Sequence, residues 1–81
     1  MNKKMRVSPI VVSKMEFEFL ENGACRLILF ETDAEGFTTV ADIMEASNSE
    51  ARSGYRELML MLNGGIKRGG YVLRAQEGKL V

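Results

Sequence analysis

The sequence contains no histidine, no tryptophan, one proline and one cysteine among its 81 residues. A single cysteine cannot form an intramolecular disulfide, and without histidine the chain cannot assemble an ordinary zinc site or a histidine-based catalytic triad. No spacing pairs a nucleophile with a base, so we expect no enzyme, no metal and no other cofactor. A chain this short buries only a thin core, and self-association is then the expected route to stability.

Long apolar runs are also missing. The basic segment 1–14 contains only three consecutive apolar residues, Ile10 to Val12, which are too few for a secretion signal or a membrane span. The missing export signal and the unpaired thiol predict a cytoplasmic protein without a membrane partner. Cys25 itself is expected to be a small core residue, the alternative being a redox sensor.

The net charge is zero, but charges of opposite sign are segregated along the chain. Residues 1–14 carry four cations and no acid, residues 15–50 carry nine acids against Arg26 alone, and residues 51–81 carry six cations against two acids. A surface field follows local charge more than total charge, so one part of the molecule can bind a polyanion while another repels it. This pattern favours a nucleic-acid partner for the basic parts and a possible protein partner for the acidic middle.

The first third of the chain gives mixed signals. Pro9 forbids a helix through the arm, where Val7 to Val12 form either a short strand or a loose extension. Residues 15–23 are either helix or hairpin, because apolar spacings of three and four compete with alternating glutamates and the turn signal Asn22-Gly23. A helix is expected over residues 24–34.

The remaining elements are expected to be two helices and a hairpin. Thr38 or Thr39 can cap a helix with the apolar stripe Val40, Ile43 and Met44. Ser49 can cap the next helix, about 50–62, which Asn63-Gly64-Gly65 would end. Gly69-Gly70 then turns a hairpin that pairs residues 66–68 with 71–73. The order predicts a winged helix-turn-helix, mainly α with a small β-hairpin, as a domain over 15–81 behind the arm at 1–14.

These segments resemble small archaeal and bacterial winged-helix transcriptional regulators of the MarR/ArsR type. The resemblance lies in TTVADIMEAS, NSEARSGYRELMLML and GGIKRGGYVLRAQEGKLV, taken in that order, with the closing pattern Gly65, Ile66, Tyr71, Leu73 and Gly78. ENGACRLILFE is similar to the first helix of that family, through Arg26-Leu27. The sequence departs from the family pattern at Asn48-Ser49 in the turn and at Gly54 within the recognition helix.

The resemblance implies a homodimeric transcriptional regulator that binds double-stranded DNA sequence-selectively. Its recognition helix, about 50–62, would enter the major groove, and the hairpin wing at 66–74 would contact the backbone. Arg52 and Arg56 lie four residues apart and therefore on one helical face. The candidate DNA-binding residues are Arg52, Ser53, Tyr55, Arg56, Lys67, Arg68 and Arg74, and Lys3, Lys4 and Arg6 form either a minor-groove arm or a soluble tail.

Two alternatives stay open. In the first, a winged-helix module binds another protein and has no DNA role. In the second, Asn22-Gly23 turns a hairpin and the chain is an α+β domain of a different kind. The candidate dimer contacts are the arm at 1–14 together with Phe17, Phe19 and Phe30.

Overall fold

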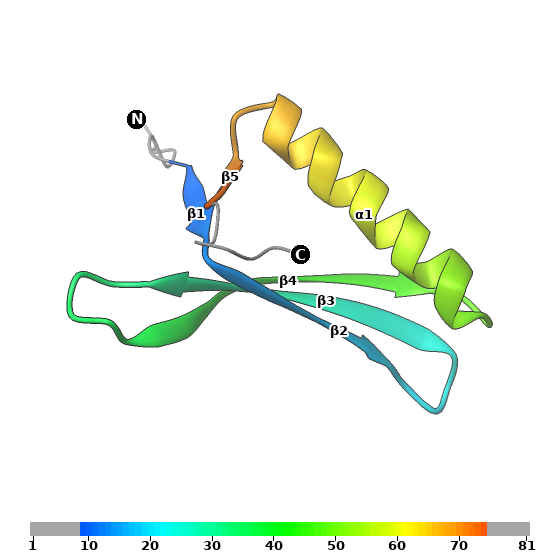
Figure 1. The fold of residues 1–81 in the computed structure, drawn as a ribbon. Coiled ribbons are helices and arrows are strands. Elements are labelled where there is room, and N and C mark those ends of the chain that lie inside the picture. Colours follow the sequence, from blue (N-terminus) through cyan, green and yellow to red (C-terminus); the bar gives the residue numbers. More distant parts are fainter. Residues whose placement is uncertain (1–8, 75–81) are drawn as a thin grey trace, which may run out of the picture.

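The computed structural model describes residues 9–74, which form a three-stranded antiparallel sheet with one α-helix across one of its faces (Figure 1). In chain order the elements are β1 (Ile10–Val12), β2 (Lys14–Phe19), β3 (Ala24–Thr32), β4 (Thr38–Ser47), α1 (Ala51–Lys67) and β5 (Tyr71–Leu73). Strand β3 lies between β2 and β4, whereas β1 and β5 form a separate parallel pair. No described element covers the other face of the sheet (Figure 1).

This architecture is mostly β, with 47% of the described residues in strands and 26% in the single helix. The predicted winged helix-turn-helix, mainly α with a small hairpin, is therefore wrong. Both segments that were expected to be helices before α1 are strands, and the expected wing is not a hairpin. The α+β alternative with a turn at Asn22-Gly23 describes the chain better.

The turn between β2 and β3 is built by Asn22 and Gly23. Gly23 has φ +87°, a left-handed conformation that favours glycine, and the Asn22 side-chain oxygen accepts a hydrogen bond of 3.0 Å from the Ala24 amide. The hairpin places Phe17 opposite Leu27 and Phe19 opposite Cys25. Residues 15–19, which the sequence left open between helix and hairpin, belong to the strand of this hairpin.

Strand β3 replaces the helix expected over 24–34 because the residues alternate between two faces. Cys25, Leu27 and Leu29 are fully buried, in a core that they share with residues of α1. The residues between them, Arg26, Ile28 and Phe30, are half-buried and belong to the opposite face. Because both faces carry apolar side chains, the sequence does not show the alternation of apolar and polar residues that is typical of a strand. An apolar run of this kind also fits helical spacing.

Strand β4 replaces the helix expected from Thr38, and a β-bulge explains the misleading pattern. Phe30 pairs with Val40 while Leu29 pairs with Asp42, so Ala41 is an extra residue in β4. The bulge puts Val40 and Ile43, three residues apart, on the same face of the sheet. A spacing of three therefore arises within a strand, and it imitates one turn of helix.

The core lies between α1 and the sheet. Leu58 and Leu62 of the helix are fully buried and pack with the apolar residues Val12, Cys25, Leu27, Leu29 and Met44. Gly54 lets the helix approach closely, because a Cβ at this position would lie 2.0 Å from Cys25 Sγ. Cys25 is thus a buried core residue, as expected.

The ends of α1 differ from those predicted. Glu50, not Ser49, is the N-cap residue, and it makes no side-chain capping bond. Instead, the Asn48 side-chain oxygen accepts a hydrogen bond of 3.2 Å from the Glu50 amide. The helix also continues through Asn63-Gly64-Gly65 to Lys67. Gly65 is buried there, where a Cβ would lie 2.4 Å from a ring carbon of Tyr71.

The predicted wing, residues 66–74, is wrong. Ile66 and Lys67 form the last turn of α1, and Gly69, with φ +84°, turns the chain into β5. Strand β5 pairs in parallel with β1, with Tyr71 opposite Ile10, so its partner comes from the far end of the chain. The strand reading of residues 7–12 is confirmed for Ile10–Val12.

Tyr71 ties three elements together. Its ring packs on Gly65 of α1, and its hydroxyl donates a hydrogen bond to the Asp42 carboxylate of β4. This hydrogen bond, followed by burial and the negative charge of Asp42, raises the pKa of Tyr71 to about 12, although Arg68 opposes the rise. Protonated Tyr71 is therefore the form that the fold favours.

Titration of Tyr71 makes stability depend on alkaline pH. A pKa raised from 10.0 in the unfolded chain to about 12 in the fold gives a stabilisation that is complete below pH 10.0. We expect it to disappear as the pH rises through about 12. The tyrosinate absorbance of the Tyr55→Phe variant, in which Tyr71 is the only tyrosine, measures this pKa, and Asp42→Asn should lower it. An unchanged pKa in Asp42→Asn would contradict the assignment.

Candidate nucleic-acid interface

The solvent face of α1 carries a line of polar and cationic side chains. Arg52, Arg56, Asn63 and Lys67 are all exposed, and at 3.6 residues per turn they fall within an arc of about 60°. The buried residues Gly54, Leu58, Leu62 and Gly65 lie on the opposite side of the helix. With a rise of 1.5 Å per residue, Arg52 and Lys67 are about 22 Å apart along the axis. We call these four residues the outer face of α1.

The cations of this face make no ion pairs within residues 9–74. The two ion pairs recorded there both lie on the sheet, joining Lys14 to Glu16 and Arg26 to Glu18 at 3.2 Å each. The acids of residues 15–47, by contrast, all belong to the strands and their turns. The charge segregation along the sequence therefore becomes a separation between layers, with a basic helix on an acidic sheet.

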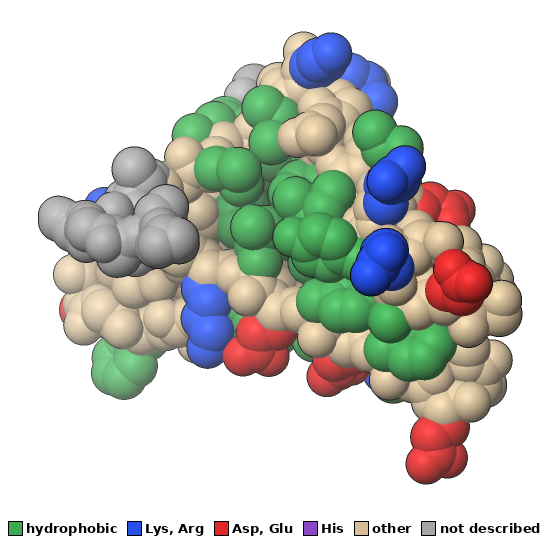
Figure 2. Space-filling model, turned by 45° about the vertical axis from the view of Figure 1, so that its right-hand side comes forward, with side chains coloured by type: hydrophobic (Ala, Val, Ile, Leu, Met, Phe, Trp, Pro, Cys, Tyr) green, Lys and Arg blue, Asp and Glu red, His purple; other side chains and the backbone are tan. Residues whose placement is uncertain are grey.

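Figure 2 shows one side of the molecule, where red acidic side chains also lie next to the blue cations. Blue Lys and Arg side chains follow one another along the upper right, beside a green apolar region. Apolar residues that pack partly buried against the core include Phe17 and Met59, one from β2 and one from α1.

Ser53 and Tyr55 lie near the cations but have partners within the protein. Ser53 Oγ donates a hydrogen bond of 3.2 Å to a Glu50 carboxylate oxygen in the first turn of α1. The Tyr55 ring packs edge-on against Phe17 of β2, with ring centroids 5.3 Å apart. Both residues flank the outer face, and their roles as DNA contacts stay predictions.

The structure separates Arg68 from the outer face. Arg68 is the C-cap residue of α1 and lines a groove between the helix and β4 with Met44, Met61 and Tyr71. Its guanidinium is one of the charges that act on Tyr71. Of the cations predicted at the hairpin, only Lys67 therefore joins Arg52 and Arg56.

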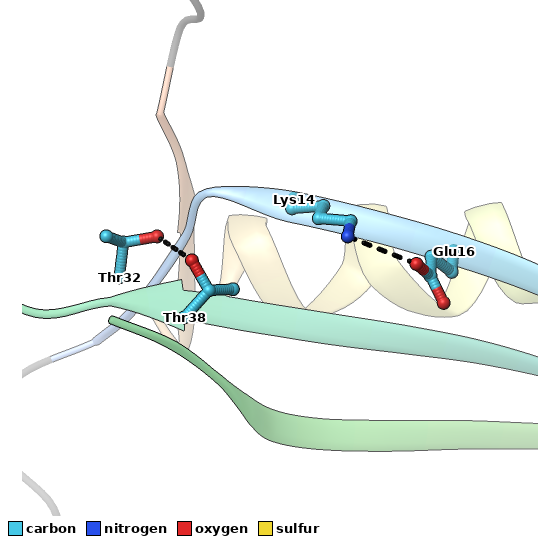
Figure 3. A network of polar contacts seen from close by, with 4 residues as sticks. All are labelled: Lys14, Glu16, Thr32 and Thr38. Atoms are coloured by element: carbon cyan, nitrogen blue, oxygen red, sulfur yellow. Dashed lines mark hydrogen bonds and ion pairs between the residues drawn. The ribbon is translucent and has the colours of Figure 1, made fainter. Parts of the chain in front are cut away.

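Arg74 lies elsewhere, in a hollow with Ser13, Lys14, Thr32 and Thr38. Ser13 Oγ donates to the Phe30 carbonyl, so its 2.8 Å contact with Thr32 is donated by Thr32. The 2.9 Å contact between Thr32 and Thr38 is then donated by Thr38 (Figure 3). The hydroxyl protons of Ser13, Thr32 and Thr38 are thus all donated within this chain. Lys14, in the same hollow, pairs with Glu16. The hydroxyls thus bind the strands together and offer no donor to an anion.

Sequence reasoning missed Asn63 as a surface residue of the helix. It was assigned to a helix stop, because Asn-Gly-Gly is typical of helix ends. The signal that could have shown otherwise is the apolar Ile66, which continues the spacing of Leu58 and Leu62. With α1 extended to Lys67, Asn63 lies between Arg56 and Lys67 on the outer face.

Two further kinds of site are absent from the described part of the chain, namely metal clusters and membrane-spanning helices. Residues 9–74 hold no cluster of three or more carboxylate or cysteine ligands that could bind a metal ion. No helix among them combines the length and apolar character needed to cross a membrane. Lys3, Lys4 and Arg6, the predicted minor-groove arm, lie outside the described residues, as does most of the arm at 1–14.

The chain matches no protein-family model, no curated protein and no solved structure.

Proposed function

We propose that this protein binds double-stranded DNA by laying the outer face of α1 in the major groove. The observation that carries the proposal is the alignment of Arg52, Arg56, Asn63 and Lys67 on one exposed helical face, with no ion pair to neutralise the cations within residues 9–74. A major groove about 12 Å wide admits one α-helix. The helix predicted to be the recognition helix keeps that role in this proposal, whereas residues 66–74 have no role as a wing.

The side chains on this face suit both parts of DNA recognition. Arginine can form two hydrogen bonds with guanine, and asparagine can form two with adenine, so Arg52, Arg56 and Asn63 can read bases. Lys67, at the far end of α1, can contact a phosphate. This composition favours a sequence-selective protein, as expected for a transcriptional regulator.

The opposite face of the molecule supports the same orientation. The sheet and its turns carry eight acids, Glu16, Glu18, Glu21, Glu31, Asp33, Glu35, Asp42 and Glu45, against the cations Lys14 and Arg26. A duplex would be repelled there and attracted to the helix, so the field of the molecule orients the encounter. The net charge of zero is therefore compatible with DNA binding through one side.

Salt dependence provides the first test. If the three cations of the outer face each displace a counterion, log K should fall with log salt at a slope of about −2.7. Fluorescence anisotropy with a labelled duplex measures this slope. We expect Arg52→Ala combined with Arg56→Ala to weaken binding at least about tenfold, since each arginine contact contributes about 1–3 kcal/mol.

Arg74→Ala is the matched control, because it removes an arginine that the structure places away from the helix face. It should bind as the wild type does. Selection of duplexes from a random pool then tests selectivity, and a shared motif among the selected sequences is the expected result. Binding with no salt dependence, or equal losses in Arg74→Ala and in the helix variants, would contradict the proposed surface.

A further inference from the structure

The face of the sheet that α1 leaves open has an apolar centre. Paired residues of adjacent strands share a face, which places Phe30 beside Val40 and Ile28 beside Ile43. Val40 is 53% exposed and Ile43 is 45% exposed, while Ile28 and Phe30 are half-buried. We call these four residues the apolar square.

Charged side chains surround the apolar square on two sides. Along β2, Lys14, Glu16 and Glu18 form a polar margin, in which Lys14 lies over the Phe30 ring. Lys14 also pairs with Glu16 (Figure 3). Beyond Ile28 and Ile43, Arg26 of β3 stands opposite Glu45 of β4. An apolar centre with a charged margin is typical of protein–protein interfaces.

We infer that the open face of the sheet is a dimer interface, on which a second copy of this chain packs its own open face. The arrangement that fits is a two-fold axis parallel to the strands, between β3 and β4. This axis stacks β3 of one copy on β4 of the other, so Phe30 meets the partner's Val40 and Ile28 meets the partner's Ile43. The charged margin of β2 then remains at the rim.

Charge complementarity at one end of the apolar square identifies the partner as a second copy. The same axis places Arg26 against the partner's Glu45, and Glu45 against the partner's Arg26. The Arg26 side chain is 32% exposed, and the ion pair recorded for it within residues 9–74 uses only its buried Nε, 3.2 Å from Glu18. Its other guanidinium N–H groups can therefore bind a second carboxylate. An axis perpendicular to the strands through the centre of the apolar square would instead set Arg26 over the partner's Thr32, which carries no charge.

The size of the face sets the expected affinity. Three strands spaced about 4.8 Å apart and about 30 Å long give a footprint of roughly 400 Å² per copy. Standard stable interfaces bury about 800 Å² per partner. We therefore expect a reversible dimer with a dissociation constant in the micromolar range.

Sedimentation velocity over a wide range of protein concentration tests the interface. The wild type should change from a 9.0 kDa monomer to a dimer of twice that mass as concentration rises. Ile43→Lys should remain monomeric throughout. Val72→Lys is the control, because Val72 is exposed to nearly the same degree as Ile43, at 44%, but lies on β5. It should dimerise as the wild type does.

A charge exchange tests the axis and does not depend on the Ile43 variant folding. Arg26→Glu and Glu45→Arg should each weaken dimerisation at least about tenfold, because each sets like charges against one another. The double variant should restore it. A wild type that stays monomeric at millimolar concentration, a double variant no better than the singles, or equal dissociation by Val72→Lys would overturn the inference.

Discussion

Gly54→Ala is expected to destabilise the fold by about 3 kcal/mol, although alanine is the better helix former by about 1 kcal/mol. The added methyl group would lie 2.0 Å from Cys25 Sγ and 3.1 Å from Cys25 Cβ, in a core with no exposed surface at Cys25. Helix α1 would have to move away from β3. Small domains have little stability to lose, so much of the population should unfold. Urea denaturation followed by circular dichroism measures the change.

Two companion variants separate the steric cause from a general glycine effect. Gly64→Ala, in the same helix, places its methyl group near only the flexible end of Arg68, so it should be neutral or stabilising by up to about 1 kcal/mol. Cys25→Ala in the Gly54→Ala background removes the clashing sulfur and should recover about 2 kcal/mol as a coupling energy. Equal stability of Gly54→Ala and the wild type would refute the close approach of α1 and β3.

A helix over about 50–62 was predictable because its signals are local, although its continuation to Lys67 was missed. Leu58 and Leu62 lie four residues apart, as the buried residues of one helix face do. Asn48 precedes the helix, and its side-chain oxygen accepts a hydrogen bond from the amide of the N-cap residue Glu50. The buried Gly54, which seemed to conflict with a helix, is explained by the sheet beneath it. That explanation requires Cys25, 29 residues earlier in the chain, and no local pattern contains it.

The strands β3 and β4 were mistaken for helices because of the residues on the open face. Ile28 and Phe30 interrupt the alternation that Cys25, Leu27 and Leu29 would otherwise show. The bulge at Ala41 gives Val40 and Ile43 a helical spacing. The four residues that made the strands resemble helices in sequence are those of the apolar square. This coincidence is expected if they serve an interface, since functional surfaces are where local rules are broken.

The candidate site was predicted in part. Arg52 and Arg56 could be placed on one helix face from their spacing alone, and the structure brings Lys67 to the same face by extending the helix. Arg68 and Arg74 could not be placed, because their positions depend on β5 pairing with β1 rather than with residues 66–68. That pairing joins residues about sixty positions apart, and two short strands carry no sequence signal for it. Of the predicted dimer contacts, Phe30 lies on the open face, whereas Phe17 packs against Tyr55 on the helix side.

The two proposals together predict that the protein joins two DNA duplexes. In a dimer stacked through its open sheet faces, each α1 covers the far side of its own sheet. With layers about 10 Å apart, the two helices would lie about 30 Å from one another with their outer faces directed oppositely. One duplex cannot follow both faces, so each helix of the dimer is free to bind a separate duplex.

Capture of a second duplex measures this bridging. Beads that carry one duplex should retain a labelled second duplex only when the protein concentration exceeds the dissociation constant of the dimer. Ile43→Lys should still bind a single duplex but lose nearly all capture of the second. Val72→Lys should keep both activities, because β5 belongs to neither proposed surface. The combined Arg52→Ala and Arg56→Ala variant should lose both activities while still dimerising. Capture of the second duplex by monomeric Ile43→Lys would show that bridging does not depend on the sheet interface. Loss of dimerisation in the combined arginine variant would show that the helix, not the sheet, joins the two copies.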